Sequence, residues 1–246
     1  MDYIDRYFDT IKNILDNILK NEKENIDMAA KAMVDSIEKG NALFVFGCSH
    51  AGILAEELFY RAGGLALMNP IFNPTMMLNT RPVTLTSKME RLHEFGKIII
   101  DESPLKKGDV ILIHSVSGRN SATIDAALRA KEKGAKVIGL TNLNYSKNVS
   151  SRHNSGKNLY EICDIVIDNC GDFEDASIKF DEMGQKVGPT STAVGATIVN
   201  SIIIRVCEII LEKGNKPPVF HSANVDGGDE FNKTIFKLYK NSIHYL

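Results

Sequence analysis

The chain has 246 residues, and its 29 Lys and Arg against 31 Asp and Glu give a formal net charge of −2. Nucleic-acid-binding surfaces need clustered basic side chains, so this balance argues against such a surface as the main function. With 43% hydrophobic and 24% charged residues, the composition excludes a disordered chain and is sufficient for a large core. The length fits one large α/β domain or at most two small ones.

The sequence predicts a cytoplasmic protein that does not span a membrane. The first twenty residues carry charge throughout and lack an apolar core, so they resemble neither a signal peptide nor a transit peptide. The most apolar stretch, 190–211, contains Asn200, Arg205 and Glu208, which favours a buried helix over a membrane span. The four cysteines form no CxxC pair, so reduced thiols are expected rather than disulfides or a zinc site.

Two amphipathic helices are predicted at the start of the chain. Apolar residues recur at steps of three and four from Ile4 to Ile18 and again from Ile26 to Ile37. Gly40 is well placed to cap the second helix. We therefore expect a helical arm over about 1–39.

Short, fully apolar runs predict the strands of a sheet. These runs are 42–46, 65–68, 109–114, 136–141 and 164–168. Helical patterns over 53–62 and 121–133 lie between them. Fully apolar strands that alternate with helices are typical of a parallel sheet covered on both faces. The prediction is an α/β fold with an open, doubly wound, five-stranded parallel sheet.

The second half of the chain is predicted to be rich in helix. A long helix should run over about 190–212, and a final helix should follow Asp229 with Phe231, Ile235 and Leu238 on its buried side. Ser87-Lys88-Met89-Glu90 has the spacing of a capping box before a short helix. No internal repeat is visible, so 1–246 is predicted to be a single domain. Its sheet core would span about 41–213, and a C-terminal loop and helix about 214–246.

Small polar residues follow the third predicted strand and lead directly into a helix. The segment reads Ser115-Val116-Ser117-Gly118-Arg119-Asn120-Ser121, in which serines and Asn120 supply the small polar side chains. Open parallel sheets bind ligands beyond the carboxyl ends of their strands, and the N–H groups of a helix N-terminus attract anions. The loop is therefore a candidate anion site, and a helix cap with a tight turn is the alternative. Arg119 could meet a second anionic group or be a surface charge.

Two more turns carry small hydroxyl residues. The first strand ends in Gly47-Cys48-Ser49-His50-Ala51-Gly52, which matches neither the dinucleotide fingerprint nor a P-loop. A third run, Thr190, Ser191 and Thr192, opens the long helix. Three such turns, each at a predicted helix N-terminus, favour a polyhydroxylated anionic ligand.

Together these motifs resemble the sugar isomerase (SIS) domain family over about Asp27 to Glu212. The resemblance implies a five-stranded parallel sheet of flavodoxin-like order, phosphosugar ligands, and a homodimer or a dimer of dimers. The runs 151–157 and 222–229 look like a less characterised bacterial branch of the family, which extends the match over nearly the whole chain.

The resemblance also implies site residues. Family members hold the phosphate with the loop after the third strand and with a serine of the first turn. Two registers of that turn are open, one with Ser49 and one with Ala51 at the serine position, and we favour Ser49. The predicted phosphosugar contacts are Ser49, His50, Ser115, Ser117, Gly118, Arg119, Asn120, Ser121, Thr190, Ser191 and Thr192.

A sugar-phosphate isomerase needs a base that moves a proton between C1 and C2, and a lyase-type relative needs a carboxylate for the same abstraction. Heptose-isomerase and etherase relatives carry a Glu on the helix after the first turn. Counting from the first glycine places Arg61 at that position, and Glu57 comes one turn earlier. Glu57 is our candidate base, although an i, i+4 ion pair with Arg61 is the competing explanation.

Histidines are the other candidates for proton transfer. His153 and His221 lie in loops and could enter the site from a neighbouring subunit, although solvated loop histidines are the alternative. The long helix lacks the histidine that heptose isomerases use there, which disfavours that activity. His93, His114 and His244 are expected to be structural, and Cys48 is expected to be a packing residue. The acidic residues between Asp164 and Asp175 show no regular metal spacing and are read as a solvated loop.

The sequence thus predicts a phosphosugar-binding protein that isomerises or otherwise transforms its ligand by proton abstraction next to a carbonyl. No cofactor and no metal are expected. The rival hypothesis is a sensor that binds the phosphosugar without turning it over. A nucleotide-binding protein is a third possibility, and the missing glycine fingerprint and lysine argue against it.

Overall fold

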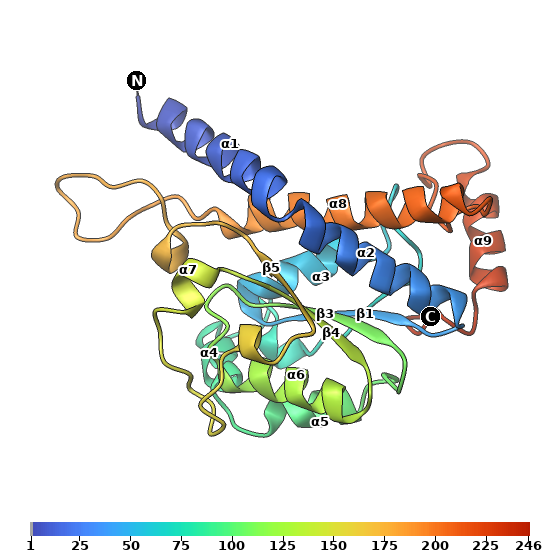
Figure 1. The fold of residues 1–246 in the computed structure, drawn as a ribbon, viewed down its shortest axis with the longest axis horizontal. Helices are drawn as coiled ribbons and strands as arrows, with labels where there is room; N and C mark the ends of the chain where they lie inside the picture. Colours follow the sequence, from blue (N-terminus) through green and yellow to red (C-terminus); the bar gives the residue numbers. More distant parts are fainter. Residues whose placement is uncertain (1) are drawn as a thin grey trace.

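The computed structural model describes residues 2–246 and contains a five-stranded parallel sheet in the order β2-β1-β3-β4-β5 (Figure 1). The strands are β1 (Leu43–Gly47), β2 (Met68–Pro70), β3 (Val110–His114), β4 (Lys136–Thr141) and β5 (Ile165–Asp168). The chain builds outward from β1 to β2 on one side and from β3 to β5 on the other. The loops after β1 and β3 therefore meet at the topological switch point, where open sheets bind ligands. The predicted fold class is confirmed.

Helices flank this sheet. The α-helices are α1 (Tyr3–Asn21), α2 (Lys23–Glu38), α3 (Ile53–Leu58), α4 (Thr84–Glu90), α5 (Phe95–Asp101), α6 (Ser121–Glu132), α7 (Leu143–Ser146), α8 (Ser191–Glu212) and α9 (Gly228–Leu238). Four short 3-10 turns are η1 (Ser49–Gly52), η2 (Pro74–Met76), η3 (Leu159–Glu161) and η4 (Phe173–Asp175). The turns η1 and η4 lie next to strand ends, where the predicted site residues are.

Successive side chains of each strand are buried on opposite faces of the sheet. Leu43 and Val45 of β1 belong to the core formed with α2, α3 and α8, whereas Phe44 and Phe46 belong to the core formed with α5 and α6. Side chains alternate along a strand, so a strand covered on both faces needs apolar residues at every position. This burial explains the continuous apolar runs of the sequence.

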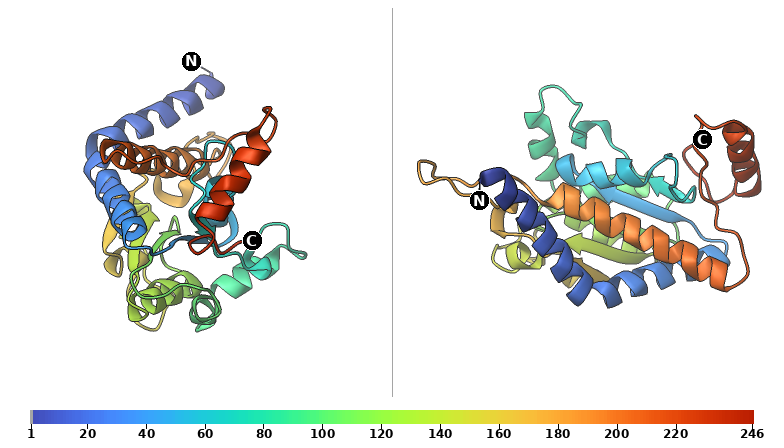
Figure 2. Two further views of the ribbon diagram at one scale, coloured as in Figure 1. Left: turned by 90° about the vertical axis from the view of Figure 1, so that its right-hand side faces the viewer. Right: turned by 90° about the horizontal axis from the view of Figure 1, so that it is seen from above.

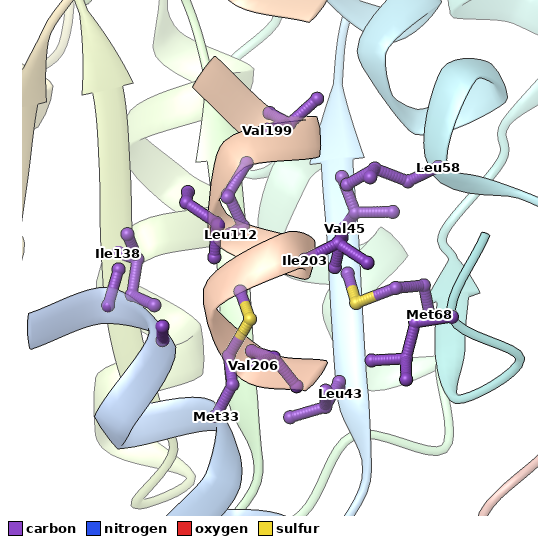
Figure 3. Close-up of a cluster of buried hydrophobic side chains, with 14 of the residues drawn as sticks. Met33, Leu43, Val45, Leu58, Met68, Leu112, Ile138, Val199, Ile203 and Val206 are labelled. Carbon is purple, nitrogen blue, oxygen red and sulfur yellow. The ribbon is translucent and has the colours of Figure 1, made fainter. Parts of the chain in front are cut away.

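The helix α8 is long and apolar enough to cross a membrane by length and composition alone. It packs on the sheet instead, and its Val199, Ile203 and Val206 face Val45 and other strand residues in the core (Figure 3). Half of its most apolar window is buried within the structure. The helix is therefore a core helix, as the sequence predicts.

The two ends of α8 lie at opposite ends of the strands. The helix begins after β5, near the carboxyl ends of the strands, and runs back toward their amino ends (Figure 2). There the N–H of Phe220 donates to the carbonyl of Gly64 at 3.0 Å, just before β2. His221 follows Phe220, and α9 and the C-terminus lie at this same end (Figure 2).

The helix predicted over 53–62 is too long. The helix α3 ends at Leu58 because Phe59 adopts an extended conformation, with φ −95° and ψ 129°. The ring of Phe59 packs edge-on against Tyr245 at 5.0 Å between centroids. A contact with the C-terminal residues thus takes the place of another helical turn.

Two other local predictions are wrong. The second strand begins at Met68, whereas Leu65 forms an antiparallel bridge with Val219. In α9 the buried residues are Gly228 and Ile235, and Phe231 and Leu238 are 47% and 76% exposed. The reason is that α9 packs at the end of the sheet through a narrow face.

Candidate functional site

Contacts with Ser146 and Leu159 hold the loop between β3 and α6 in place. Gly118 has φ +61°, and a Cβ at this position would lie 2.8 Å from the Ser146 hydroxyl, so only glycine fits. The N–H of Leu159 donates to the Gly118 carbonyl at 2.8 Å. These contacts fix the backbone that leads into α6.

The N-terminus of α6 is open. Its N-cap, Asn120, has an extended conformation and makes no side-chain cap, and no other side chain within residues 2–246 caps the first turn. Nor do the hydroxyls of Ser115 and Ser117 bond to any protein group that the structure describes. The positive end of a 12-residue helix and two free hydroxyls therefore face the carboxyl edge of the sheet.

A loop from the neighbouring strand covers one side of this helix start. The N–H of Arg152 donates to the Arg119 carbonyl at 2.9 Å, and the Ser121 hydroxyl donates to the Arg152 carbonyl at 3.0 Å. His153 Nε2 lies 2.9 Å from Asp125 Oδ1, and burial raises the pKa of Asp125. His153 thus anchors the loop to α6, and Ser121, a predicted ligand residue, is already engaged.

Three arginines gather beside the same helix start. They are Arg91, Arg119 and Arg152, and none of them has a carboxylate within ion-pair distance among residues 2–246. Other arginines are paired, namely Arg61, Arg129 and Arg205. The Nε of Arg119 is buried without a partner. Burial and the neighbouring Arg119 and Arg91 guanidinium groups lower the pKa of Arg152. This cluster gives the edge a positive potential that the overall charge of −2 conceals.

The turn after β1 is tightly packed and places Ser49 beside α4. A Cβ at Gly47 would lie 2.5 Å from the Ala51 carbonyl oxygen, so the turn requires glycine there. That same carbonyl accepts from His114 Nδ1 at 3.0 Å, and burial lowers the pKa of His114 to about 4. Ser49 has φ 51° and donates its hydroxyl toward α4. His50 is exposed in the same turn.

The partner of Ser49 is Glu90, which sequence reasoning missed as a site residue. Ser49 Oγ donates to Glu90 Oε1 at 2.5 Å, and Asn120 Nδ2 donates to Glu90 Oε2 at 2.9 Å. The predicted capping box is wrong, because α4 begins at Thr84 and Glu90 is its last residue. The carboxylate instead links the turn after β1 to the loop after β3.

The N-terminus of α8 already holds an anion of the protein itself. Asp175 Oδ1 accepts from the N–H groups of Thr190 and Ser191 at 3.1 and 2.8 Å, and Asp175 Oδ2 accepts from the Ser191 hydroxyl at 2.5 Å. Asp175 is therefore a capping residue rather than part of a solvated acidic loop. Thr192 is exposed beside it.

The catalytic candidates are not all brought together. Glu57 is paired with Arg61 and also accepts from Asn200 Nδ2 of α8 at 2.7 Å, so the predicted ion pair is present. His221 lies at the opposite end of α8 from the serine loop of the same chain. Cys48 is buried 3.9 Å from the Thr123 hydroxyl, and burial raises the pKa of its thiol, which fits a packing role.

Comparison with known proteins decides the family. The model of the SIS domain matches residues 6–142. The chain belongs to the SIS domain family. It is 50% identical to a UPF0309 protein of Shouchella clausii and 52% identical to one of Oceanobacillus iheyensis, in each case over 246 residues and the full length of both chains.

Solved structures share the fold of this SIS domain. A phosphoheptose isomerase from Francisella tularensis is 18% identical with a TM-score of 0.53, over 84% of this chain and 98% of that one. Phosphoheptose isomerase from Neisseria gonorrhoeae is 16% identical with a TM-score of 0.54, over 85% and 97%. The Vibrio vulnificus NanR protein complexed with ManNAc-6P is 17% identical with a TM-score of 0.53, over 96% and 70%.

Proposed function

We propose that this SIS domain binds a sugar phosphate with the phosphate at the N-terminus of α6. The observation that carries the proposal is the uncapped first turn of α6, beside which the hydroxyls of Ser115 and Ser117 have no partner among residues 2–246. Backbone N–H groups and hydroxyls stabilise an anion without any formal charge. The unpaired Arg119 and Arg152 add long-range attraction for an anionic ligand.

The proposed reaction is isomerisation, or a related conversion, by proton abstraction next to a carbonyl. It needs one tuned carboxylate or histidine and no cofactor. Glu57 is the proposed base, since its Oε1 is oriented by Arg61 and by Asn200 across the α3–α8 contact. His153 is tied to Asp125, which favours a structural role, and His221 could act only from a second chain.

A homodimer in the cytoplasm is the proposed state of the protein. The exposed face of α1 carries Ile4, Phe8 and Leu19, which are 69%, 61% and 66% exposed. On α8, Ile204 is 68% exposed. Apolar side chains in such a row are costly in water and indicate a covered surface. A second copy of the chain would bury them and bring loops from another subunit toward the site.

A sensor that binds a phosphosugar without converting it is the second candidate. The NanR protein, which shares this fold, is complexed with ManNAc-6P in its structure. The ion pair of Glu57 with Arg61 also favours this candidate, because Arg61 and Asn200 already occupy the carboxylate oxygen Oε1. Turnover is the property that separates the two.

The test is a thermal-shift screen of hexose, hexosamine and N-acetylmuramic acid phosphates, followed by turnover assays on each ligand that binds. A ligand at about 100 times its Kd should add about 2.7 kcal/mol to the free energy of unfolding. Ser117→Ala should reduce this gain to about 1.4 kcal/mol at the same ligand concentration. Ser87→Ala, which changes an exposed serine of α4, should keep the full shift.

The catalytic part is tested with Glu57→Gln. This variant should keep the thermal shift and lose turnover if Glu57 is the base. Binding without turnover of any ligand by the wild-type protein would favour the sensor. Absence of binding by every phosphosugar would overturn the proposed function.

A further inference from the structure

Glu90 lies between the loop after β1 and the loop after β3, the two loops that are predicted to bind the phosphosugar. It ends α4, far from both loops in the sequence, and each of its carboxylate oxygens accepts one hydrogen bond. One donor is Ser49 Oγ at 2.5 Å, after β1, and the other is Asn120 Nδ2 at 2.9 Å, at the start of α6. Asn120 is itself fixed on its other side, because its Oδ1 accepts from Arg152 Nη1 at 2.8 Å.

This arrangement conflicts with Ser49 and Asn120 acting as phosphate ligands. A phosphate bound to the same two donors would lie on the order of 4 Å from the Glu90 carboxylate. Two like charges at that distance repel each other, and the partial burial of Glu90 reduces the screening by water. The phosphate is therefore left with Ser115, Ser117 and the first turn of α6, where no carboxylate hydrogen bond is present among the described residues.

The carboxylate of Glu90 is instead suited to a neutral hydrogen-bond donor. An ionised carboxylate only accepts hydrogen bonds and offers about four lone-pair positions, of which Ser49 and Asn120 take two. Glu90 is half-buried, so the other positions are open to a ligand. Sugar hydroxyls are donors of this kind, and they carry no charge that the carboxylate would repel.

We propose that Glu90 contacts the carbohydrate part of the ligand by accepting hydrogen bonds from its hydroxyls, and that Ser49 and Asn120 position Glu90 instead of binding phosphate. The assignment rests on the proposed function and divides the site in two. The serine loop and the start of α6 bind the phosphate, and Glu90 distinguishes a phosphosugar from free phosphate.

The experiment is calorimetric titration with two probes, inorganic phosphate and the hexose 6-phosphate that gives the largest thermal shift. Glu90→Gln keeps the size of the side chain and removes its charge. We expect it to bind the hexose phosphate about tenfold more weakly, because a hydrogen bond to a charged acceptor is stronger than one to a neutral acceptor. Inorganic phosphate should bind equally well or more tightly, because a repelling charge is gone.

Two further variants keep the test independent of folding. Glu102→Gln, an exposed glutamate next to α5, should change neither affinity. Asn120→Ala retains Glu90 but removes one positioning donor, and it should weaken only the hexose phosphate.

A parallel loss of both probes in Glu90→Gln would overturn the assignment, because a structural role would affect both. Unchanged affinity for the hexose phosphate would also overturn it, yet would leave the proposed function intact. If the wild-type protein bound no phosphosugar, the proposed function would fail and the assignment with it.

Discussion

The N-termini of α6 and α8 lie at the same edge of the sheet and have similar sequences, but their surroundings differ. Both begin with serine or threonine after a strand end. At α8 the carboxylate of Asp175 accepts from Thr190 and Ser191, so that helix start is complete. At α6 no side chain within residues 2–246 caps the first turn, and the neighbouring arginines lack carboxylate partners.

The comparison shows that α8 has an anionic cap supplied by the protein, whereas α6 has an uncapped N-terminus that a bound anion could occupy. A helix N-terminus leaves several N–H groups without partners, and a protein can satisfy them internally or leave them to a ligand. Asp175 is the internal solution, and it adopts a left-handed φ of 57° to reach its position. The start of α6 has the same need, and no side chain among residues 2–246 meets it, which is why the proposed phosphate is placed there.

Removing Asp175 should have the largest effect on stability. Asp175→Ala leaves two buried N–H groups and a hydroxyl at α8 without their acceptor, and we expect it to cost about 3 kcal/mol of the free energy of unfolding. Chemical denaturation measures this loss. Asp172→Ala, which removes an exposed ion pair with Lys186, should cost less than about 0.5 kcal/mol. Equal effects of the two variants would contradict the capping role.

His114 makes the edge sensitive to pH. Its pKa is about 4 in the folded protein and 6.5 as the reference value, so the unfolded chain binds the proton more readily. The contribution is complete above pH 6.5 and is lost as the pH falls toward 4, with about 2 kcal/mol lost by pH 5. Denaturation curves of His114→Gln should lack this decrease, and His50→Gln, an exposed histidine, should retain it. The same decrease in His114→Gln would exclude His114 as its source.

Gly118→Ala should disturb the uncapped N-terminus of α6 and leave the N-terminus of α8, which Asp175 caps, unchanged. The positive φ and the 2.8 Å approach to the Ser146 hydroxyl predict a cost of about 1–2 kcal/mol. The thermal shift by a phosphosugar should also fall. Gly184→Ala is a matched control, because a Cβ there meets nothing within 4 Å. A variant Gly118→Ala with wild-type stability and binding would show that the loop does not need this conformation.

Most of the fold could be predicted from the sequence because its determinants are local. Fully apolar runs mark strands that are buried on both faces, and glycines with polar neighbours mark the turns after them. The serine loop was predictable for the same reason. The boundaries that were wrong, such as the end of α3 at Leu58, depend on a distant contact between Phe59 and Tyr245.

The candidate site could be predicted only in part, because its partners come from remote segments. Ser49 and Glu90 are 41 positions apart, and Asn120 and Arg152 are 32 apart. No local pattern indicates which hydroxyls remain free. The sequence therefore predicts equal roles for Ser117 and Thr190. In the structure they differ, because Thr190 donates to the carboxylate of Asp175.

The most direct test of the account is calorimetric titration of the best phosphosugar into Ser117→Ala and Thr192→Ala. These variants remove one hydroxyl from each helix start. The account predicts a Kd about tenfold higher for Ser117→Ala, with stability within about 0.5 kcal/mol of the wild type, and no change for Thr192→Ala. Unchanged affinity in Ser117→Ala together with a loss in Thr192→Ala would contradict the placement of the phosphate at α6.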